Sequence, residues 1–295
     1  MRTDFCVFIL SHGRPDRVHT FATLQKLGYT GRLYIVIDDE DKTADAYRAT
    51  FGDRVLQFCK ADIAARFDEA DTFNDRRAIF YARNACWQLA AQVGCRYFVE
   101  FDDDYNDFSI RFKRDGTFCH ISVDRQFDAL ADASIRFLDA AKPLTLCLAQ
   151  GGDYFGGFPD TKTLLAFRRK AMNSFFCDTR RQFAFRGRVN EDVSTYTTLG
   201  RCGELMLTTM IAMLNQATTQ TQSGGMTELY RDSGTYIKTF YTVIHCPSAV
   251  KVGMMGDPRA DNHRIHHDID WRYCAAKIMR ADVRKPRPLP LQPAV

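Results

Sequence analysis

The chain has 295 residues, enough for a large core in one elaborated α/β domain or in two small ones. Its 45% hydrophobic and 26% charged residues are typical of an ordinary globular enzyme. No apolar run approaches the roughly 20 residues that a membrane helix needs, so we expect no membrane partner. The net charge of +4 is too small to indicate a polyanionic partner by itself.

Cysteine usage and the N-terminus bear on the cellular compartment. Ten cysteines lie between Cys6 and Cys274 without a C-x-x-C pair, whereas a disulfide framework or a zinc site would cluster them. We therefore expect reduced, mostly buried thiols. Residues 1–4 lack the charged-then-apolar order of a signal peptide. These features predict a cytoplasmic protein.

The first hundred residues alternate between apolar strand patterns and helical patterns. We expect strands over residues 4–10, 33–37, 55–58 and 97–101, and helices that end near residue 27 or span 43–51 and 79–93. Such alternation predicts an α/β fold with a mostly parallel, Rossmann-like sheet flanked by helices, which binds ligands at the carboxyl ends of its strands.

Three polar clusters follow these strands. Ser11, His12, Gly13 and Arg14 follow the first, Asp38 and Asp39 the second, and Asp102, Asp103 and Asp104 the fourth. All three should converge on one edge of one sheet, which is stronger support for a nucleotide site than any single cluster.

The second half is less regular. We expect a hairpin turn at 114–116, a helix over 126–140, a strand over 145–149, a glycine-aromatic loop at 151–157 and a second glycine pair at 224–225. The simplest organisation is one domain over residues 1–285, with a nucleotide-binding half (1–108) and an irregular acceptor half (109–285). A proline-rich tail follows at 286–295.

Three consecutive aspartates at the end of a buried strand repel one another, and a divalent cation removes that cost. Mg²⁺ or Mn²⁺ prefers carboxylate oxygen and accepts further ligands from a diphosphate. Asp102 and Asp104 can point to one side of an extended segment, so we predict them as metal ligands. The alternative is a capping or turn cluster.

Two other regions offer chemical groups. Asp192, in Asn-Glu-Asp, is a candidate general base that would take a proton from an acceptor hydroxyl, or else a carboxylate held at a helix start. His267, favoured over His263 and His266, could complete a metal site, although polar loop histidines are the alternative. Lys251 could contact a diphosphate or lie on the surface.

Arginine outnumbers lysine among the 40 basic residues and suits bidentate phosphate recognition. Six arginines are close in sequence to Asp192 and could hold a nucleic-acid backbone: Arg168, Arg169, Arg180, Arg181, Arg186 and Arg188. A solvated arginine face is the alternative.

The order of these motifs, with Arg83 and Asn84 between the second and third clusters, resembles GT-A glycosyltransferases over about residues 5–278. More narrowly, the chain resembles the TET-associated glycosyltransferases, found in bacteriophages and in some eukaryotic proteins. The narrower resemblance rests on Gly224-Gly225 and the stretch 266–271.

The resemblance implies a UDP-sugar donor whose sugar is a hexose or an N-acetylhexosamine. Its diphosphate would be bound to Mn²⁺ or Mg²⁺. The donor-binding set comprises Ser11, Arg14, Asp38, Asp39, Arg83, Asn84, Asp103 and Lys251. Asp38 or Asp39 would contact the uridine, and Arg83 with Asn84 would lie near the base or sugar. Asp192 would be the base of an inverting displacement, although a retaining enzyme of this fold needs no such base.

The resemblance also implies an acceptor and a companion. The acceptor would be 5-hydroxymethylcytosine in DNA, made by a TET-like dioxygenase, in the cytoplasm of the infected bacterium for a phage protein. A protein or small-molecule hydroxyl, and a catalytically inactive nucleic-acid-binding module, stay as alternatives. A nucleotidyltransferase is disfavoured because the first turn, residues 12–15, has one glycine. The sugar, the stereochemistry, the DNA sequence context and the oligomeric state stay open.

Overall fold

The computed structural model of the protein describes residues 1–154, 165–166, 168–216, 229–230, 232, 234, 236–259 and 263–276, without the side chains of 165–166. The expected tail, the glycine pair at 224–225 and part of the loop at 151–157 therefore lie outside the described residues. All ten cysteines are free, and seven of them are buried.

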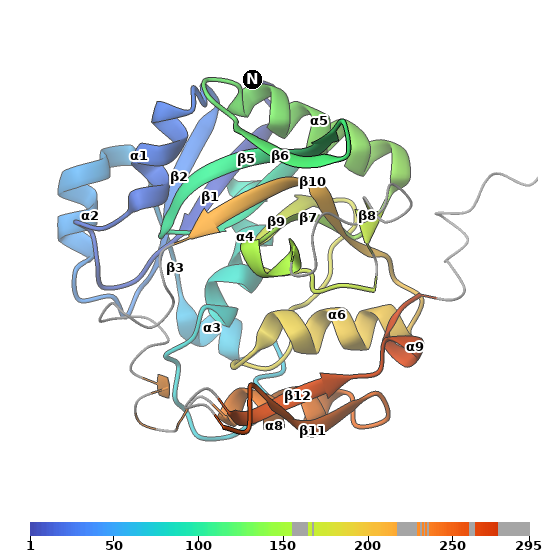
Figure 1. Ribbon diagram of the computed structural model, residues 1–295. Coiled ribbons are helices and arrows are strands. Elements are labelled where there is room, and N and C mark those ends of the chain that lie inside the picture. The colour runs from blue at the N-terminus through green and yellow to red at the C-terminus, as the bar shows by residue number, and fades with distance from the viewer. Residues whose placement is uncertain are drawn as a thin grey trace, which may run out of the picture.

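One ten-stranded sheet forms the centre of the fold, in the order β3-β2-β1-β4-β9-β7-β10-β5-β6, with β8 also paired to β10 (Figure 1). Its strands are β1 (Phe5–Leu10), β2 (Arg32–Asp38), β3 (Val55–Phe58), β4 (Tyr97–Asp102), β5 (Tyr105–Arg114), β6 (Thr117–Ser122), β7 (Thr145–Ala149), β8 (Leu165–Ala166), β9 (Ser174–Asp178) and β10 (Met206–Gln216). Strands from both expected halves of the chain therefore share one sheet.

Pairing within the sheet changes along its width. The first four strands are parallel, and β7 also pairs with β10 in parallel. Antiparallel neighbours join these parts, since β9 runs against both β4 and β7 and β5 runs against β10. The expected α/β fold with a large sheet flanked by helices is confirmed.

Helices cover both faces of the sheet (Figure 1). The helices are α1 (His19–Lys26), α2 (Ala44–Phe51), α3 (Lys60–Ala64), α4 (Phe80–Gln92), α5 (Phe127–Ala141) and α6 (Glu191–Arg201), with short 3-10 turns at Gly52–Arg54 and Gly151–Tyr154. Residues of α1, α2 and α5 pack on one face of the sheet, and residues of α3, α4 and α6 pack on the other.

The burial of the central strands explains why they read as continuous apolar runs. In β1, Phe5, Val7 and Ile9 enter the core under α5, whereas Cys6 and Phe8 enter the core under α4. A strand buried on both faces needs an apolar side chain at every position rather than at alternate ones.

A smaller layer lies beyond α6. It contains α8 (Ile237–His245), a second sheet of β11 (Val250–Met255) and β12 (Arg264–Ile269), and α9 (Trp271–Cys274) (Figure 1). Both α8 and α9 contact α6. Among the described residues, no helix is long and apolar enough to cross a membrane.

Candidate active site

Three polar clusters meet at the carboxyl edge of the parallel strands. Leu10 of β1 is in register with Val36 of β2 and with Asp102 of β4, so these strands end side by side. The chain turns to one side of β1 to form β2 and to the other side to form β4. In open α/β sheets, ligands bind in the crevice at such a switch point.

Side-chain alternation divides the aspartate motif between the two faces of the sheet. Asp103 lies on the α1 and α2 side, fully buried. One of its carboxylate oxygens accepts hydrogen bonds from Ser11 Oγ at 2.5 Å and from Arg14 Nε at 2.7 Å. Ser11 Oγ also lies 2.6 Å from the hydroxyl of Tyr47. Ser11, Arg14 and Asp103, all predicted donor contacts, therefore bind one another and fix the turn after β1.

Asp102 points to the other face, where Arg83 of α4 lies. The Arg83 guanidinium is 2% exposed and stands 3.1 Å from Asp102 Oδ1, 2.8 Å from Glu191 Oε1 and 3.5 Å from Glu100 Oε2. Glu100 is two residues before Asp102 and shares its face of β4. Arg83 was predicted to contact the donor base or sugar; the structure places it beneath the site, where it joins the end of β4 to the start of α6.

The three carboxylates around Arg83 bear more negative charge than one guanidinium neutralises. Burial raises the pKa of Glu100 to about 8 and that of Glu191 to about 7, against the lowering effect of Arg83. Both oxygens of Glu100 are buried without a hydrogen-bond partner among the described residues. Both glutamates therefore bind a proton more readily than an exposed carboxylate does.

Asp104 is the least satisfied member of the aspartate motif. Burial, together with the negative charges of Asp102 and Asp103, raises its pKa to about 7. Its buried Oδ1 has no hydrogen-bond partner among the described residues. A cation would satisfy this oxygen and offset the repulsion, so the chemistry of the aspartates suits a divalent metal. Within the described ranges, however, no group of three or more His, Cys, Asp or Glu side chains could hold a metal ion.

Asp192 lies in the first turn of α6, 8% exposed. Its Oδ1 accepts a 2.7 Å hydrogen bond from the backbone amide of Val193, as expected for a carboxylate at a helix start. Burial nonetheless raises its pKa, and the charge of Asp102 acts in the same direction. The structure thus brings Asp192 within electrostatic reach of Asp102, as a carboxylate with a raised proton affinity.

Comparison with known proteins shows the family to which the chain belongs. A sequence model of TET-associated glycosyltransferases matches residues 5–225 of the chain. The chain belongs to the TET-associated glycosyltransferase family. It is therefore a glycosyltransferase, as the order of its motifs predicted.

Other comparisons add little to the family match. Among solved structures, the chain is similar to the crystal structure of S. aureus TarS 1-349, with 11% identity and a TM-score of 0.40. The alignment covers 83% of this chain and 66% of that chain. No curated protein matches the chain.

Sequence reasoning missed two partners of Asp38 in this glycosyltransferase. His12 Nδ1 lies 2.7 Å from Asp38 Oδ2, and the buried ammonium of Lys60 lies 2.9 Å from Asp38 Oδ1. Asp39 accepts a 2.9 Å hydrogen bond from the backbone amide of Lys60. The sequence placed His12 in a polar cluster at the same sheet edge without pairing it with Asp38, whereas nothing in the sequence around Lys60 marks that lysine.

Two predicted donor contacts lie away from the polar clusters. Asn84 is buried, and its amide bonds to the backbone of Phe80 and Phe185, so it ties α4 to the segment before α6. Lys251 is exposed on β11, opposite Asp268 in the register. Their positions give Asn84 a structural role and leave Lys251 at the surface of the smaller layer.

His267 lies on β12 rather than in a polar loop, and it is 7% exposed. Neither ring nitrogen has a hydrogen-bond partner among the described residues. Burial, together with the neighbouring His266, Lys170 and Lys238, lowers its pKa to about 3. The imidazole is therefore neutral, but its surroundings are cationic and unfavourable for a metal ion.

The six arginines predicted to hold nucleic acid do not form one surface. Because β9 runs against β4, Arg180 and Arg181 lie beyond Asp178, at the edge of the sheet opposite Asp102. Arg181 is bound by the carbonyls of Pro143 and Leu138 and by Asp178. Arg181 therefore lies apart from the end of β4 that carries Asp102, and its predicted contact with nucleic acid stays a prediction.

The other four arginines also differ from one another. Arg188 is buried and paired with Asp71 at 2.6 Å, so its guanidinium cannot reach a DNA backbone without breaking that pair. Arg169 is half-buried and lies 3.1 Å from Asp153. Arg168 and Arg186 are exposed and stay candidates for phosphate contacts.

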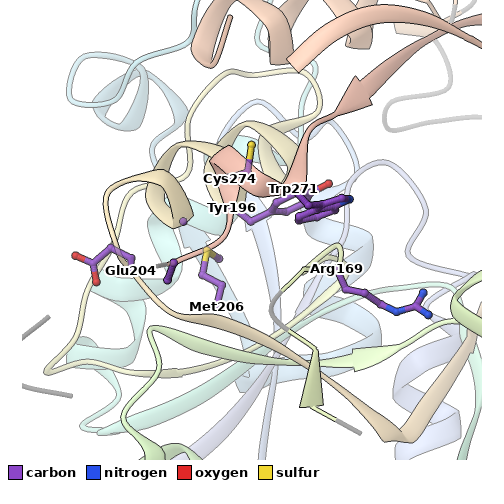
Figure 2. A pocket seen from close by; sticks show the side chains of 8 residues that line it. Arg169, Tyr196, Glu204, Met206, Trp271 and Cys274 are labelled. Carbon is purple, nitrogen blue, oxygen red and sulfur yellow. The ribbon is translucent and has the colours of Figure 1, made fainter. Parts of the chain in front are cut away.

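A small pocket lies along α6, beyond Asp192. Tyr196 and Gly200 line it, and since they follow Asp192 by four and eight residues, they share its helix face. The rings of Tyr196 and Trp271 are stacked, with centroids 5.6 Å apart. Figure 2 shows both rings together with Arg169, which also lines the pocket. The enclosed space is about 10 Å³, which holds one water molecule, so the pocket is too small for a sugar or a base.

Proposed function

We propose that this glycosyltransferase moves a sugar from a UDP-sugar to the hydroxyl of 5-hydroxymethylcytosine in DNA, with a divalent metal at Asp102 and Asp104. The observation that carries the proposal is the ion-pair network of Arg83, which joins Asp102 at the end of β4 to Glu191 at the start of α6. Asp102 is the candidate metal ligand and Glu191 precedes the candidate base Asp192, so the network links two groups that are far apart in sequence.

The donor would lie at the switch point between β1 and β4. Asp38 and Asp39 follow β2 beside it and are the candidates for contacts with the uridine. Asp102 and Asp104 would face the diphosphate. A bound Mn²⁺ or Mg²⁺ would supply positive charge for the departing nucleoside diphosphate, with further ligands from phosphate and water.

Asp192 would act on the acceptor. Its carboxylate accepts the proton of the attacking hydroxyl while the new bond forms at the anomeric carbon and the bond to the diphosphate breaks. Burial favours proton uptake at Asp192, which suits this role better than an exposed carboxylate would. Arg83 does not touch the substrate in this scheme; it holds Asp102 and Glu191, and through Glu191 it positions Asp192.

The DNA acceptor is supported by the family description and by the exposed Arg168 and Arg186 on the two segments that precede β9 and α6. A buried catalytic carboxylate cannot reach a base inside a duplex, so the target nucleotide would have to leave the stack. The modified cytosine would come from a TET-like dioxygenase.

The test is mass spectrometry of nucleosides from hydroxymethylcytosine-containing DNA, after incubation with the enzyme, Mn²⁺ and each of several UDP-sugars. We expect a hexose or N-acetylhexosamine mass on the modified cytidine, and its loss in Asp102→Ala and Asp192→Asn. Asp45→Asn, at an exposed position of α2, is the matched control and should keep full transfer.

Two outcomes would redirect the proposal. Metal-dependent release of UDP without added mass on DNA would keep the glycosyltransferase and point to a protein or small-molecule hydroxyl. DNA binding without turnover of any donor, and without a need for metal, would instead favour a binding module. Equal transfer with and without a chelator would remove the metal from the proposal.

A further inference from the structure

We infer that Lys170, Lys238 and the imidazoles of His266 and His267 form a binding site for a phosphate group beside Asp192. The source of the phosphate rests on the proposed function: it is either the diphosphate of the donor or a phosphodiester of the acceptor strand. The inference concerns residues that sequence reasoning either did not select or assigned to a metal.

Lys238 is placed beside Asp192 by the packing of α8 on α6. Thr242, one turn after Lys238 on the same face of α8, accepts a 2.6 Å hydrogen bond from Asn190 Nδ2. Asn190 is the residue before α6 and lies two residues from Asp192. Lys238 therefore stands over the start of α6, and the charge of Asp192 acts on it.

Lys170 reaches the same place from the sheet. Its carbonyl accepts a 2.7 Å hydrogen bond from Thr208 Oγ1 of β10, and four residues later Ser174 begins β9, in register with Phe101. Ser174 therefore lies at the carboxyl end of β4, and Lys170 precedes it by four residues. The positive charge of Lys170 acts on Asp192, Lys238 and both histidines, so Lys170 lies within electrostatic reach of each of these groups.

The histidines close the cluster from β12, which packs against α8. Their ring centroids are 4.0 Å apart. Three of their four ring nitrogens are buried and lack a hydrogen-bond partner among the described residues: Nδ1 of His266, and Nδ1 and Nε2 of His267. A neutral imidazole keeps one N–H donor, so each ring can donate one hydrogen bond into the cluster.

The charge of the cluster decides its ligand. Among the described residues, Lys60 is the one lysine whose ammonium group forms an ion pair. Lys170 and Lys238 therefore have no carboxylate partner in the described part of the chain. Burial lowers the pKa of Lys238, and the charges of Arg264 and Lys170 lower it further. A cation would add to this repulsion, whereas a phosphate would remove it and accept hydrogen bonds from ammonium and imidazole N–H groups.

The experiment measures the binding of two probes to the purified full chain, without turnover. UDP in the presence of Mn²⁺ reports on the donor side, and a short unmodified single-stranded DNA reports on the acceptor side. Lys170→Met and Lys238→Met keep an unbranched side chain that is one atom shorter and remove the charge. Lys142→Met is the matched control, since Lys142 is an exposed lysine after α5, before the start of β7.

We expect each cluster variant to weaken the binding of at least one probe by roughly tenfold or more, and the control to bind like wild type. Weaker UDP binding with unchanged DNA binding assigns the site to the donor diphosphate, and the reverse assigns it to the acceptor phosphodiester. Weaker binding of both places the site where the two substrates meet. Unchanged binding of both probes in both variants overturns the inference.

Two controls separate this result from folding and from the proposed function. Uridine, which has no phosphate, should bind every variant equally, and thermal unfolding midpoints should match wild type. If UDP binding depends on the lysines but no sugar reaches hydroxymethylcytosine, the phosphate site stands and the DNA acceptor falls. If transfer occurs and neither lysine affects either probe, the function stands and the site falls.

Discussion

Asp102 and Asp103 are neighbours in the chain but lie in different surroundings on the two sides of the sheet. Asp103 is fully buried and bound by Ser11 and Arg14. Asp102 is partly exposed, and the one guanidinium that it contacts is shared with Glu191 and Glu100. The first arrangement uses a carboxylate to fix a turn, and the second leaves carboxylates in excess of the available positive charge.

The comparison teaches how one motif can serve both stability and chemistry. Alternation along β4 sends Asp103 toward α1 and α2 and Asp102 toward α4 and α6. Thr20 of α1 holds the backbone between them, since its amide donates to the carbonyl of Asp103 and its hydroxyl donates to the carbonyl of Asp102. These bonds fix the main chain so that Asp103 points inward and Asp102 points toward the candidate site.

The largest expected effect tests the reactive side. Asp192→Asn removes the proposed base while keeping the size of the side chain, and we expect transfer to fall by about 10²–10⁴-fold. Because burial raises the pKa of Asp192, the wild-type rate should rise with pH as this carboxylate loses its proton. Steady-state kcat/KM over a pH series checks both. A variant that retains its rate, or a wild type without this limb, would show that Asp192 only starts a helix.

The next effect concerns Arg83, the positive charge that Asp102, Glu100 and Glu191 share. Arg83→Met leaves buried carboxylates without a partner, and we expect a loss of about 3–5 kcal/mol in the free energy of unfolding. The loss should be smaller at low pH, where Glu100 and Glu191 are protonated and need no counter-charge. Urea unfolding at two pH values measures it. A loss that does not change with pH would indicate packing against Phe175 rather than charge.

The aspartates themselves give a paired test. Asp103→Asn breaks a buried pair with Arg14 and should lower the free energy of unfolding by about 1–3 kcal/mol. Asp102→Asn should affect stability less and transfer more, because Asp102 is partly exposed and its partner keeps Glu191. Urea unfolding and transfer rates of both variants decide it. If the ratio of lost stability to lost transfer is the same in both variants, the assignment of Asp103 to stability and Asp102 to transfer is wrong.

The contrast between the two aspartates was visible in the sequence only in part. The parallel strands were predicted to within about two residues because strands buried on both faces give unbroken apolar runs. The convergence of the three clusters followed from that topology. The network around Arg83 did not, because Glu191 is 108 residues away and no local pattern reveals such a contact. Glu100 could have been found, since it shares the face of Asp102 on β4.

The C-terminal half was harder for a physical reason. The strands β11 and β12 form a two-stranded sheet with many exposed residues, so His266 and His267 lack the apolar context that marks a strand. The arginines near Asp192 in sequence were read as one surface because the antiparallel direction of β9 was unknown. That direction takes Arg180 and Arg181 to the far edge of the sheet.

A smaller effect tests this separation of the edges. Arg168→Gln, before β9, should weaken DNA binding and reduce the slope of log affinity against log salt concentration by about 1. Arg180, after β9, is also exposed but lies at the other edge, so the slope for Arg180→Gln should match wild type. Fluorescence anisotropy over a salt series measures both. Equal losses in the two variants would mean that DNA also covers the far edge.

The smallest expected effect concerns His12, the titratable hydrogen-bond partner of Asp38. The hydrogen bond to Asp38 raises the pKa of His12 above its usual 6.5, although burial opposes this. A raised folded pKa stabilises the protein fully below the unfolded pKa, and this contribution is lost as pH rises through the folded pKa. Since the side chain is 43% exposed, we expect less than about 1 kcal/mol. Urea unfolding of wild type and His12→Gln should therefore differ more at about pH 5.5 than at about pH 8.5. An equal difference at both would show that a neutral hydrogen bond, not the imidazolium charge, holds Asp38, and would leave Lys60 as its counter-charge.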